Sequence, residues 1–196
     1  MFEIVKDKIM YHASARNYKV GDVLEFGKER NYQAVRAYEQ GFRMPDGENY
    51  EIFVGDKLTN KKRLTLKETK DFLEAFYKYS YAVREYAMEE CRKRYFPDHP
   101  SRFSSLFLVD NLDSAKGYLS TAKGKLKQVE PRVIVFKLNG KLLKTSNAFN
   151  DRGLSFDDTV ENAKKYFKGV DDSFENKKSI EYLFEGKAEV VEIITQ

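Results

Sequence analysis

The chain of 196 residues has little of the chemistry that marks several classes of protein, with one cysteine, two histidines, four prolines and no tryptophan. A single cysteine, Cys91, excludes an internal disulfide framework and fits a reducing compartment. With so few cysteines and histidines, the sequence predicts no structural zinc site and no other metal. No apolar run approaches the roughly 18 residues that a membrane helix needs, so we expect no membrane partner.

Signals for export and for the common nucleotide-binding folds are also missing. Charges interrupt the N-terminal segment MFEIVKDKIMYHAS, where a signal peptide needs an apolar core, so we expect a cytoplasmic protein. The sequence has neither a glycine-rich phosphate loop nor an alternating βαβ rhythm, which argues against a Rossmann or P-loop enzyme. The net charge is only +4, and the basic clusters at 60–63 and 91–94 are more typical of solvated faces or helix ends than of nucleic-acid contacts.

The first half of the chain is predicted to be mainly helical. A helix over 66–95 contains no glycine or proline, and it follows a capping box formed by Thr65 and Glu68. The sequence FPDHP at 96–100 ends this helix, because proline cannot continue it. Helical spacing also appears at 29–42, and Pro-Asp-Gly turn chemistry follows at 43–49.

The second half is predicted to be rich in strands. Strands are expected at 104–109, 132–138, 141–146 and 188–194, with a further strand at 9–14 near the N-terminus. The dipeptide Asn139-Gly140 predicts a hairpin turn between two of these strands, and helices are expected at 113–121 and 156–168. The length suits one compact domain over 1–196, of class α+β with an antiparallel or mixed sheet.

Three short stretches carry residue types that are used in catalysis. They are YHAS at 11–14, LFLVDNLDSAKGY at 106–118 and IEYL at 180–183. Taken separately, each has a structural explanation: a histidine at a strand end commonly makes a structural hydrogen bond, aromatics fill cores, and a carboxylate on a strand commonly faces solvent. Their order along the chain is the more informative observation.

Together the three stretches resemble the motifs of the ADP-ribosyltransferase fold, in the His-Tyr-Glu branch that includes diphtheria toxin and the poly-ADP-ribose polymerases. In that branch a strand carries one aromatic and the following helix carries a second aromatic eleven residues later, as Phe107 and Tyr118 do here. The resemblance covers the first fifteen residues and about 100–194. It implies a split mixed β-sheet core, with 43–99 as a mainly helical insertion.

The resemblance implies NAD as the substrate. Phe107 and Tyr118 would enclose the nicotinamide ring, and the stacking would add roughly 0.5–1.5 kcal/mol to the burial of the ring. Glu181 would stabilise the positive charge that develops on the ribose when the nicotinamide–ribose bond breaks. His12 would bind the ribose on the adenine side.

Two further cofactor contacts follow from the first motif. The backbone of Ala13 would hold the nicotinamide amide, and Ser14 would add a hydroxyl to the pocket. The sequence departs from the branch at Phe107, where a tyrosine is usual, so that a hydroxyl is lost. Position 179 is Ser, so the Glu-x-Glu motif of arginine-modifying relatives is absent, and Glu185 is the rival for the catalytic carboxylate if the register differs.

The sequence leaves several functions open. The leading reading is an ADP-ribosyltransferase whose acceptor is a protein, a nucleic acid or a small molecule. NAD glycohydrolysis and RNA 2′-phosphotransfer are alternative uses of NAD on the same fold. A non-catalytic module that binds a nucleotide or a protein is the alternative from another class, and an α+β domain whose motifs serve only its core is the last.

Overall fold

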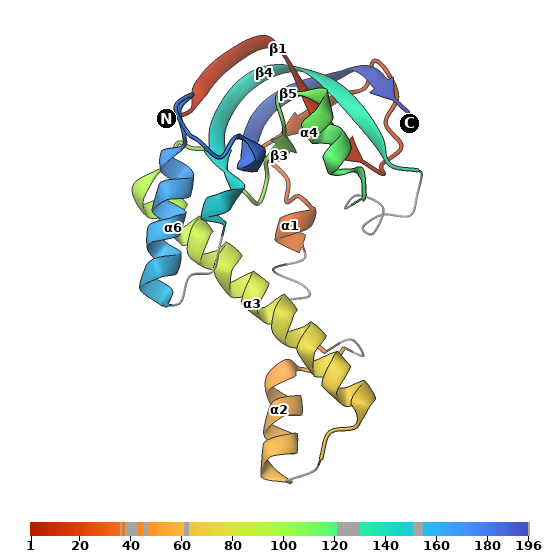
Figure 1. Cartoon of the computed structure of the whole chain (residues 1–196), viewed down its shortest axis with the longest axis vertical. Coiled ribbons are helices and arrows are strands. Elements are labelled where there is room, and N and C mark those ends of the chain that lie inside the picture. Colours follow the sequence, from red (N-terminus) through yellow and green to blue (C-terminus); the bar gives the residue numbers. More distant parts are fainter. Residues whose placement is uncertain are drawn as a thin grey trace.

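An antiparallel sheet flanked by helices forms the body of the protein in a computed structural model, which describes residues 1–35, 37, 43–44, 47–60, 63–120, 130–150 and 155–195 (Figure 1). The α+β class predicted from the sequence is therefore confirmed. The elements run in the order β1 (Glu3–Ser14), β2 (Val23–Phe26), α1 (Tyr32–Val35), α2 (Tyr50–Thr59), α3 (Leu66–Tyr95), β3 (Leu106–Leu108), α4 (Leu112–Gly117), β4 (Arg132–Ser146), α6 (Phe156–Lys168) and β5 (Ile180–Ile194), with short 3₁₀ turns at Asn147–Phe149 and Lys177–Ser179.

The sheet curls until its two edges meet. Its strands follow the order β1-β4-β5-β2, every described pair is antiparallel, and β3 pairs with the same edge of β5 as β2 does. Directly after β3, Val109 exchanges two backbone hydrogen bonds with Tyr11 of β1, at 2.9 and 3.0 Å. Strands β1, β4, β5 and β3 therefore form a closed ring.

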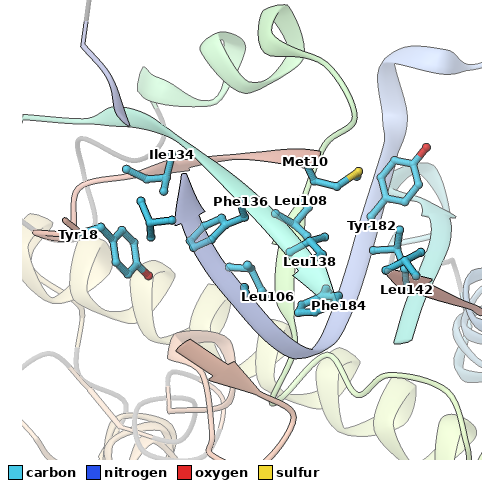
Figure 2. Close-up of a cluster of buried hydrophobic side chains, with 13 residues drawn as sticks. Met10, Tyr18, Leu106, Leu108, Ile134, Phe136, Leu138, Leu142, Tyr182 and Phe184 are labelled. Atoms are coloured by element: carbon cyan, nitrogen blue, oxygen red, sulfur yellow. The ribbon is translucent and has the colours of Figure 1, made fainter. Parts of the chain in front are cut away.

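The inside of the ring is filled by apolar side chains (Figure 2). Because side chains alternate along a strand, the members of this inner cluster in β3, β4 and β5 stand at alternating positions, and β1 adds Val5 and Met10 on either side of its bulge. Its buried members are Val5, Met10, Tyr18, Leu106, Leu108, Ile134, Phe136, Leu138, Leu142, Tyr182, Phe184, Ala188 and Val190. The inner cluster fixes which residues of β3 and β5 face outward, and Phe107 and Glu181 lie on that outer face.

The predicted hairpin at Asn139-Gly140 is wrong, because β4 continues through both residues without a turn. The Asn139 side chain instead accepts the N–H of Asp7, where β1 makes a bulge. Gly140 faces Gly186 of β5, and a Cβ atom on Gly140 would lie 2.2 Å from the Glu185 carbonyl oxygen. The glycine is needed for close contact between two strands, which is a recognised use of glycine inside a sheet.

The helices cover the outer face and extend beyond it. The second half of α3 packs beside α6, and their contact with the sheet is an outer cluster of Met88, Cys91, Leu143, Ala163, Tyr166, Phe167 and Leu183, with Phe107 at its margin. The first half of α3 projects away from the sheet and carries α2 at its far end (Figure 1). The capping box of Thr65 and Glu68 is present, as predicted. None of the helices in the described residues combines the length and apolar character that crossing a membrane requires.

The remaining predictions for the first half of the chain agree with the structure to different degrees. The helix predicted at 29–42 is seen as α1, whereas residues 36 and 38–42 lie outside the described residues. The helical character predicted for 43–99 is accounted for by α2 and α3. Arg92 of the basic cluster at 91–94 binds Glu89 and the carbonyls that follow the helix, so this cluster serves the helix end.

We expect Gly140→Ala to destabilise the fold strongly, by about 3 kcal/mol or more, because the new methyl group overlaps with backbone atoms that cannot move independently. Gly55→Ala is the matched control, because nothing lies within 4 Å of a Cβ atom on Gly55 in α2, and alanine stabilises a helix by up to about 1 kcal/mol relative to glycine. Urea denaturation of both variants measures the difference. Equal stabilities would show that β4 and β5 do not meet at these glycines.

Candidate functional site

The three motifs found in the sequence come together on adjacent strands. Strand β3 lies between β5 and β1, since Phe107 pairs with Leu183 and Val109 pairs with Tyr11. The strand that carries the first aromatic is therefore flanked by the strand with His12 and the strand with Glu181. Nothing in the spacing along the chain required this, because 95 residues separate His12 from Phe107.

Glu181 is a half-buried carboxylate on the outer face of β5, with 14% of its side chain exposed. Its Oε1 atom accepts a hydrogen bond from the Tyr166 hydroxyl at 2.5 Å and another from Arg102 Nη1 at 3.2 Å. Within the described residues no hydrogen bond reaches Oε2. One oxygen is therefore held by the protein, and the other has no hydrogen-bond partner in the described residues.

The two predicted aromatics lie close to this carboxylate. Phe107 packs at the margin of the outer cluster, with its ring centroid 5.2 Å from the Arg102 guanidinium that binds Glu181. Tyr118 ends α4 and is 38% exposed. Partial burial and the nearby charge of Glu181 raise the pKa of Tyr118, so the phenol is neutral at physiological pH. The structure thus groups Phe107, Tyr118 and Glu181 on one side of the sheet.

His12 reaches the same region from the other face. Its Nδ1 atom lies 2.8 Å from the Phe107 carbonyl oxygen, and its ring lies beside Phe136 of the inner cluster, with centroids 6.4 Å apart. Desolvation lowers the pKa of His12 from 6.5 to about 4. The imidazole is therefore neutral near pH 7, and donation from Nδ1 leaves Nε2 as an acceptor. No hydrogen bond or ion pair joins His12 to Glu181 among the described residues.

Ala13 and Ser14 have different environments. Tyr11 directs its N–H and C=O toward β3, so the alternation of the ladder directs those of Ala13 the same way, away from β4. Within the described part of the chain, neither group of Ala13 has a partner. Ser14 is buried, and its hydroxyl oxygen accepts the Arg16 N–H at 3.2 Å. The structure brings the Ala13 backbone to the site but gives Ser14 no contact with Glu181, Phe107 or Tyr118 in the described residues.

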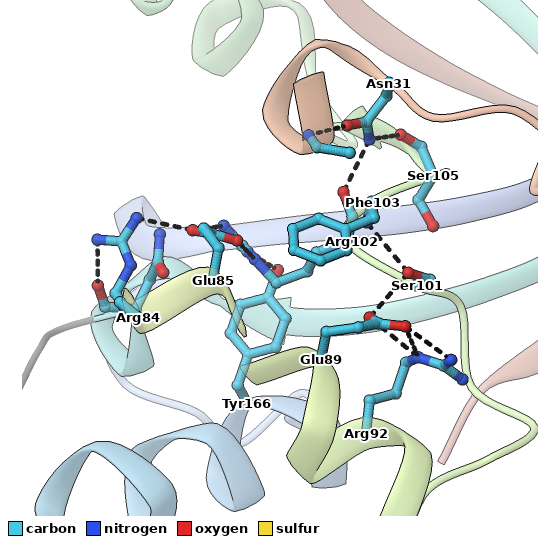
Figure 3. Close-up of polar contacts among 12 residues, drawn as sticks. Asn31, Arg84, Glu85, Glu89, Arg92, Ser101, Arg102, Phe103, Ser105 and Tyr166 are labelled. Atoms are coloured by element: carbon cyan, nitrogen blue, oxygen red, sulfur yellow. Dashed lines mark hydrogen bonds and ion pairs between the residues drawn. The ribbon is translucent and has the colours of Figure 1, made fainter. Parts of the chain in front are cut away.

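The sequence analysis missed a polar network around Arg102, which binds Glu181 (Figure 3). Arg102 is 3% exposed and forms two hydrogen bonds with Glu85 of α3, at 2.9 and 3.2 Å. Its Nη1 atom also donates to the hydroxyl of Tyr166, from α6, at 2.6 Å. One signal was present in the sequence, because Glu85 falls at helical spacing among apolar residues of α3, where a carboxylate needs a buried partner.

Arg102 belongs to a turn that is held at several points. Asn31 donates from its side chain to the carbonyls of Arg102 and Ser105, at 2.7 and 2.8 Å, and also accepts the Ala34 N–H at the start of α1. The Ser101 hydroxyl donates to Glu89 at 2.8 Å. The turn between α3 and β3 is thereby fixed, which fixes the direction of the Arg102 side chain.

Glu185, the rival for the catalytic carboxylate, has a different environment. It accepts hydrogen bonds from the Ser101 N–H at 2.8 Å and the Ser104 hydroxyl at 3.3 Å. It lines a cavity of about 370 Å³ that also includes Lys28, Arg92 and His99. Another cavity, of about 410 Å³, lies between the end of α4 and the start of β4. Glu181 and the aromatic pair line neither of these two cavities. Glu181 is nevertheless the carboxylate that lies with Phe107 and Tyr118, whereas Glu185 contacts the turn of Ser101 and Ser104.

The fold and the site define an α+β protein with a half-buried carboxylate near two aromatic side chains. The chain belongs to the family described as Protein of unknown function (DUF2441), whose model matches residues 10–196. Among curated proteins none matches the chain. The family match spans β1 from Met10 onward and all the elements that follow it, so every residue of the candidate site lies within it.

We expect the low pKa of His12 to make the fold acid-sensitive. Between pH 6.5 and about 4 the unfolded chain binds a proton at His12 that the folded protein does not, so the free energy of unfolding falls as the pH falls. From pH 6.5 to pH 5 the loss due to His12 is about 2 kcal/mol. Urea denaturation at pH 7 and pH 5 measures it.

His12→Gln is the comparison, because glutamine has a donor for the Phe107 carbonyl and does not titrate. All other titrating groups, including His99, are common to both proteins and cancel in the difference. The variant is expected to lose about 2 kcal/mol less than the wild type between the two pH values. The same loss in both proteins would contradict the burial of His12.

Proposed function

We propose that the protein is an NAD-dependent ADP-ribosyltransferase, which cleaves the nicotinamide–ribose bond of NAD and transfers ADP-ribose to an acceptor. The observation that carries this proposal is the arrangement of Glu181, which is held through one oxygen and lies near Phe107 and Tyr118. The position of Phe107 on β3, between the strand with His12 and the strand with Glu181, adds support, as does the resemblance of the three motifs to the His-Tyr-Glu branch.

The proposed chemistry uses the free oxygen of Glu181. The bond between the ribose C1′ and the pyridinium nitrogen breaks, its electron pair stays on nitrogen, and nicotinamide leaves as a neutral molecule. The ribose then has oxocarbenium character, which a nearby carboxylate stabilises. A nucleophile of the acceptor forms a bond to C1′ and loses its proton. With water as the acceptor, the same steps give NAD hydrolysis.

The remaining residues act by binding. Phe107 and Tyr118 offer apolar ring faces to the nicotinamide, and the unpaired N–H and C=O of Ala13 match its carboxamide in hydrogen-bonding capacity. Neutral His12 offers an acceptor to a ribose hydroxyl. The His12 ring lies on the inner face and Glu181 on the outer face, so contact with both requires one NAD molecule to pass beyond the end of the pairing of Tyr11 with Val109.

A non-catalytic binding module is the second candidate, and one observation favours it. Glu181 already has a counter-ion, because Arg102 lies 3.2 Å from its Oε1 atom. An ion pair of this kind also occurs where a carboxylate serves only the fold. In that case a nucleotide or a protein would bind near the two aromatics without being changed.

We expect the wild-type protein to release nicotinamide from NAD, and Glu181→Gln to reduce the rate by about 10²- to 10³-fold, because the amide is neutral and does not stabilise the developing charge. Binding of NAD, measured by calorimetry, is expected to persist in the variant. Chromatography of the products separates release of nicotinamide from transfer to an added protein or nucleic acid.

Glu185→Gln is the matched control, since it is the same change on the same face of β5, four residues away. We expect it to retain the wild-type rate. A wild-type protein that binds NAD without releasing nicotinamide would favour the binding module. Absence of NAD binding at millimolar concentration would refute both uses of NAD.

A further inference from the structure

Arg102 is a buried charged group beside the candidate site, with 3% of its surface exposed. Its guanidinium lies over the ring of Tyr166 at 4.8 Å and over that of Phe107 at 5.2 Å. Burial of a guanidinium costs several kcal/mol unless it is paired and hydrogen-bonded. The fork of two hydrogen bonds to Glu85 meets this need, and Glu85 is itself paired with Arg84 at 2.7 Å.

Glu181 is the fourth charged side chain in the group that it forms with Arg102, Glu85 and Arg84. The hydrogen bonds of its two carboxylate oxygens differ from those of Glu85. Both oxygens of Glu85 accept bonds from Arg102, whereas only Oε1 of Glu181 is engaged. Two donors converge on that single oxygen, Tyr166 at 2.5 Å and Arg102 at 3.2 Å. A purely structural partner of Arg102 would be expected to use both oxygens, as Glu85 does.

The Tyr166 hydroxyl links the cation to the carboxylate. It accepts a hydrogen bond from Arg102 Nη1 at 2.6 Å and donates its own proton to Glu181. Burial raises the pKa of Tyr166 well above its ordinary value, so the hydroxyl keeps this proton at neutral pH. The ring is fully buried in the outer cluster beside Phe167, and it therefore has no freedom to turn away.

We propose that Arg102 and Tyr166 are positioning residues of the active site, which hold Oε1 of Glu181 and thereby present Oε2 to the ribose of NAD. Glu85 fixes Arg102 in turn. This inference rests on the proposed function, because only a reacting carboxylate needs one oxygen directed in this way. It adds two residues, from the turn before β3 and from α6, that lie outside the three motifs.

Tyr166→Phe is the decisive variant, because it removes the hydroxyl and leaves the buried ring. Replacement of Arg102 is less informative, since it leaves Glu85 and Arg84 without their partner in the interior and can unfold the protein. In steady-state measurements of nicotinamide release, Tyr166→Phe is expected to lower kcat by about ten- to a hundredfold, with KM for NAD changed by less than about twofold.

The matched control is Ser104→Ala, which removes a hydroxyl donor from the carboxylate of Glu185 on the same strand. It is expected to keep the wild-type kcat. Denaturant midpoints are measured for both variants, so that kcat is compared under conditions in which each protein is fully folded. A purely structural role of Tyr166 would lower the midpoint and leave kcat unchanged.

A double-mutant cycle gives a readout that does not depend on NAD. The denaturant midpoints of Tyr166→Phe, Glu181→Gln and the double variant are compared, and the double variant is expected to lose clearly less than the sum of the single losses. Additive losses would overturn the inference, because they would show that the two side chains do not interact.

The outcomes separate the two proposals. A wild-type protein that releases no nicotinamide refutes the proposed function, and the positioning role falls with it. A wild-type protein that releases nicotinamide, with an unchanged kcat in Tyr166→Phe, overturns the positioning role alone. Loss of kcat in Tyr166→Phe, but not in Ser104→Ala, supports both.

Discussion

The neutralisation of one buried guanidinium joins the separate parts of this protein. Arg102 comes from the turn before β3, and its partners come from α3, α6 and β5. Because removing one partner from a buried ion pair leaves an uncompensated charge, the two helices and the sheet have to keep their relative positions. Apolar packing in the outer cluster brings these elements together, while Arg102 determines the orientation in which they meet.

Local signals in the sequence predicted most elements of the fold. The capping box before α3 and the prolines after it depend on neighbouring residues only, and the helix has the expected bounds. The dipeptide Asn139-Gly140 was misread because its two local preferences fit a hairpin turn, whereas its partners are Asp7 and Gly186, far away in the sequence. Strand contacts of this kind follow from tertiary structure, which a local pattern does not contain.

The residues of the candidate site also divide into those that local sequence motifs predict and those that only tertiary structure reveals. His12, Phe107 and Glu181 could be predicted because each belongs to a short motif, and their meeting on neighbouring strands is consistent with that prediction. Arg102 and Tyr166 could not be predicted, since an arginine in a turn and a tyrosine on an apolar helix face are ordinary in a sequence. Their importance comes from the distances among three elements that are distant in the chain.

The central position of β4 has a consequence for how related sequences can diverge. This strand is paired along both edges, and its two faces serve different clusters, with Phe136 and Leu142 inside the ring and Leu143 outside it. One inserted or deleted residue would exchange the faces for the rest of the strand. We therefore expect related chains to differ in length more often in α2 and the first half of α3, which project away from the sheet.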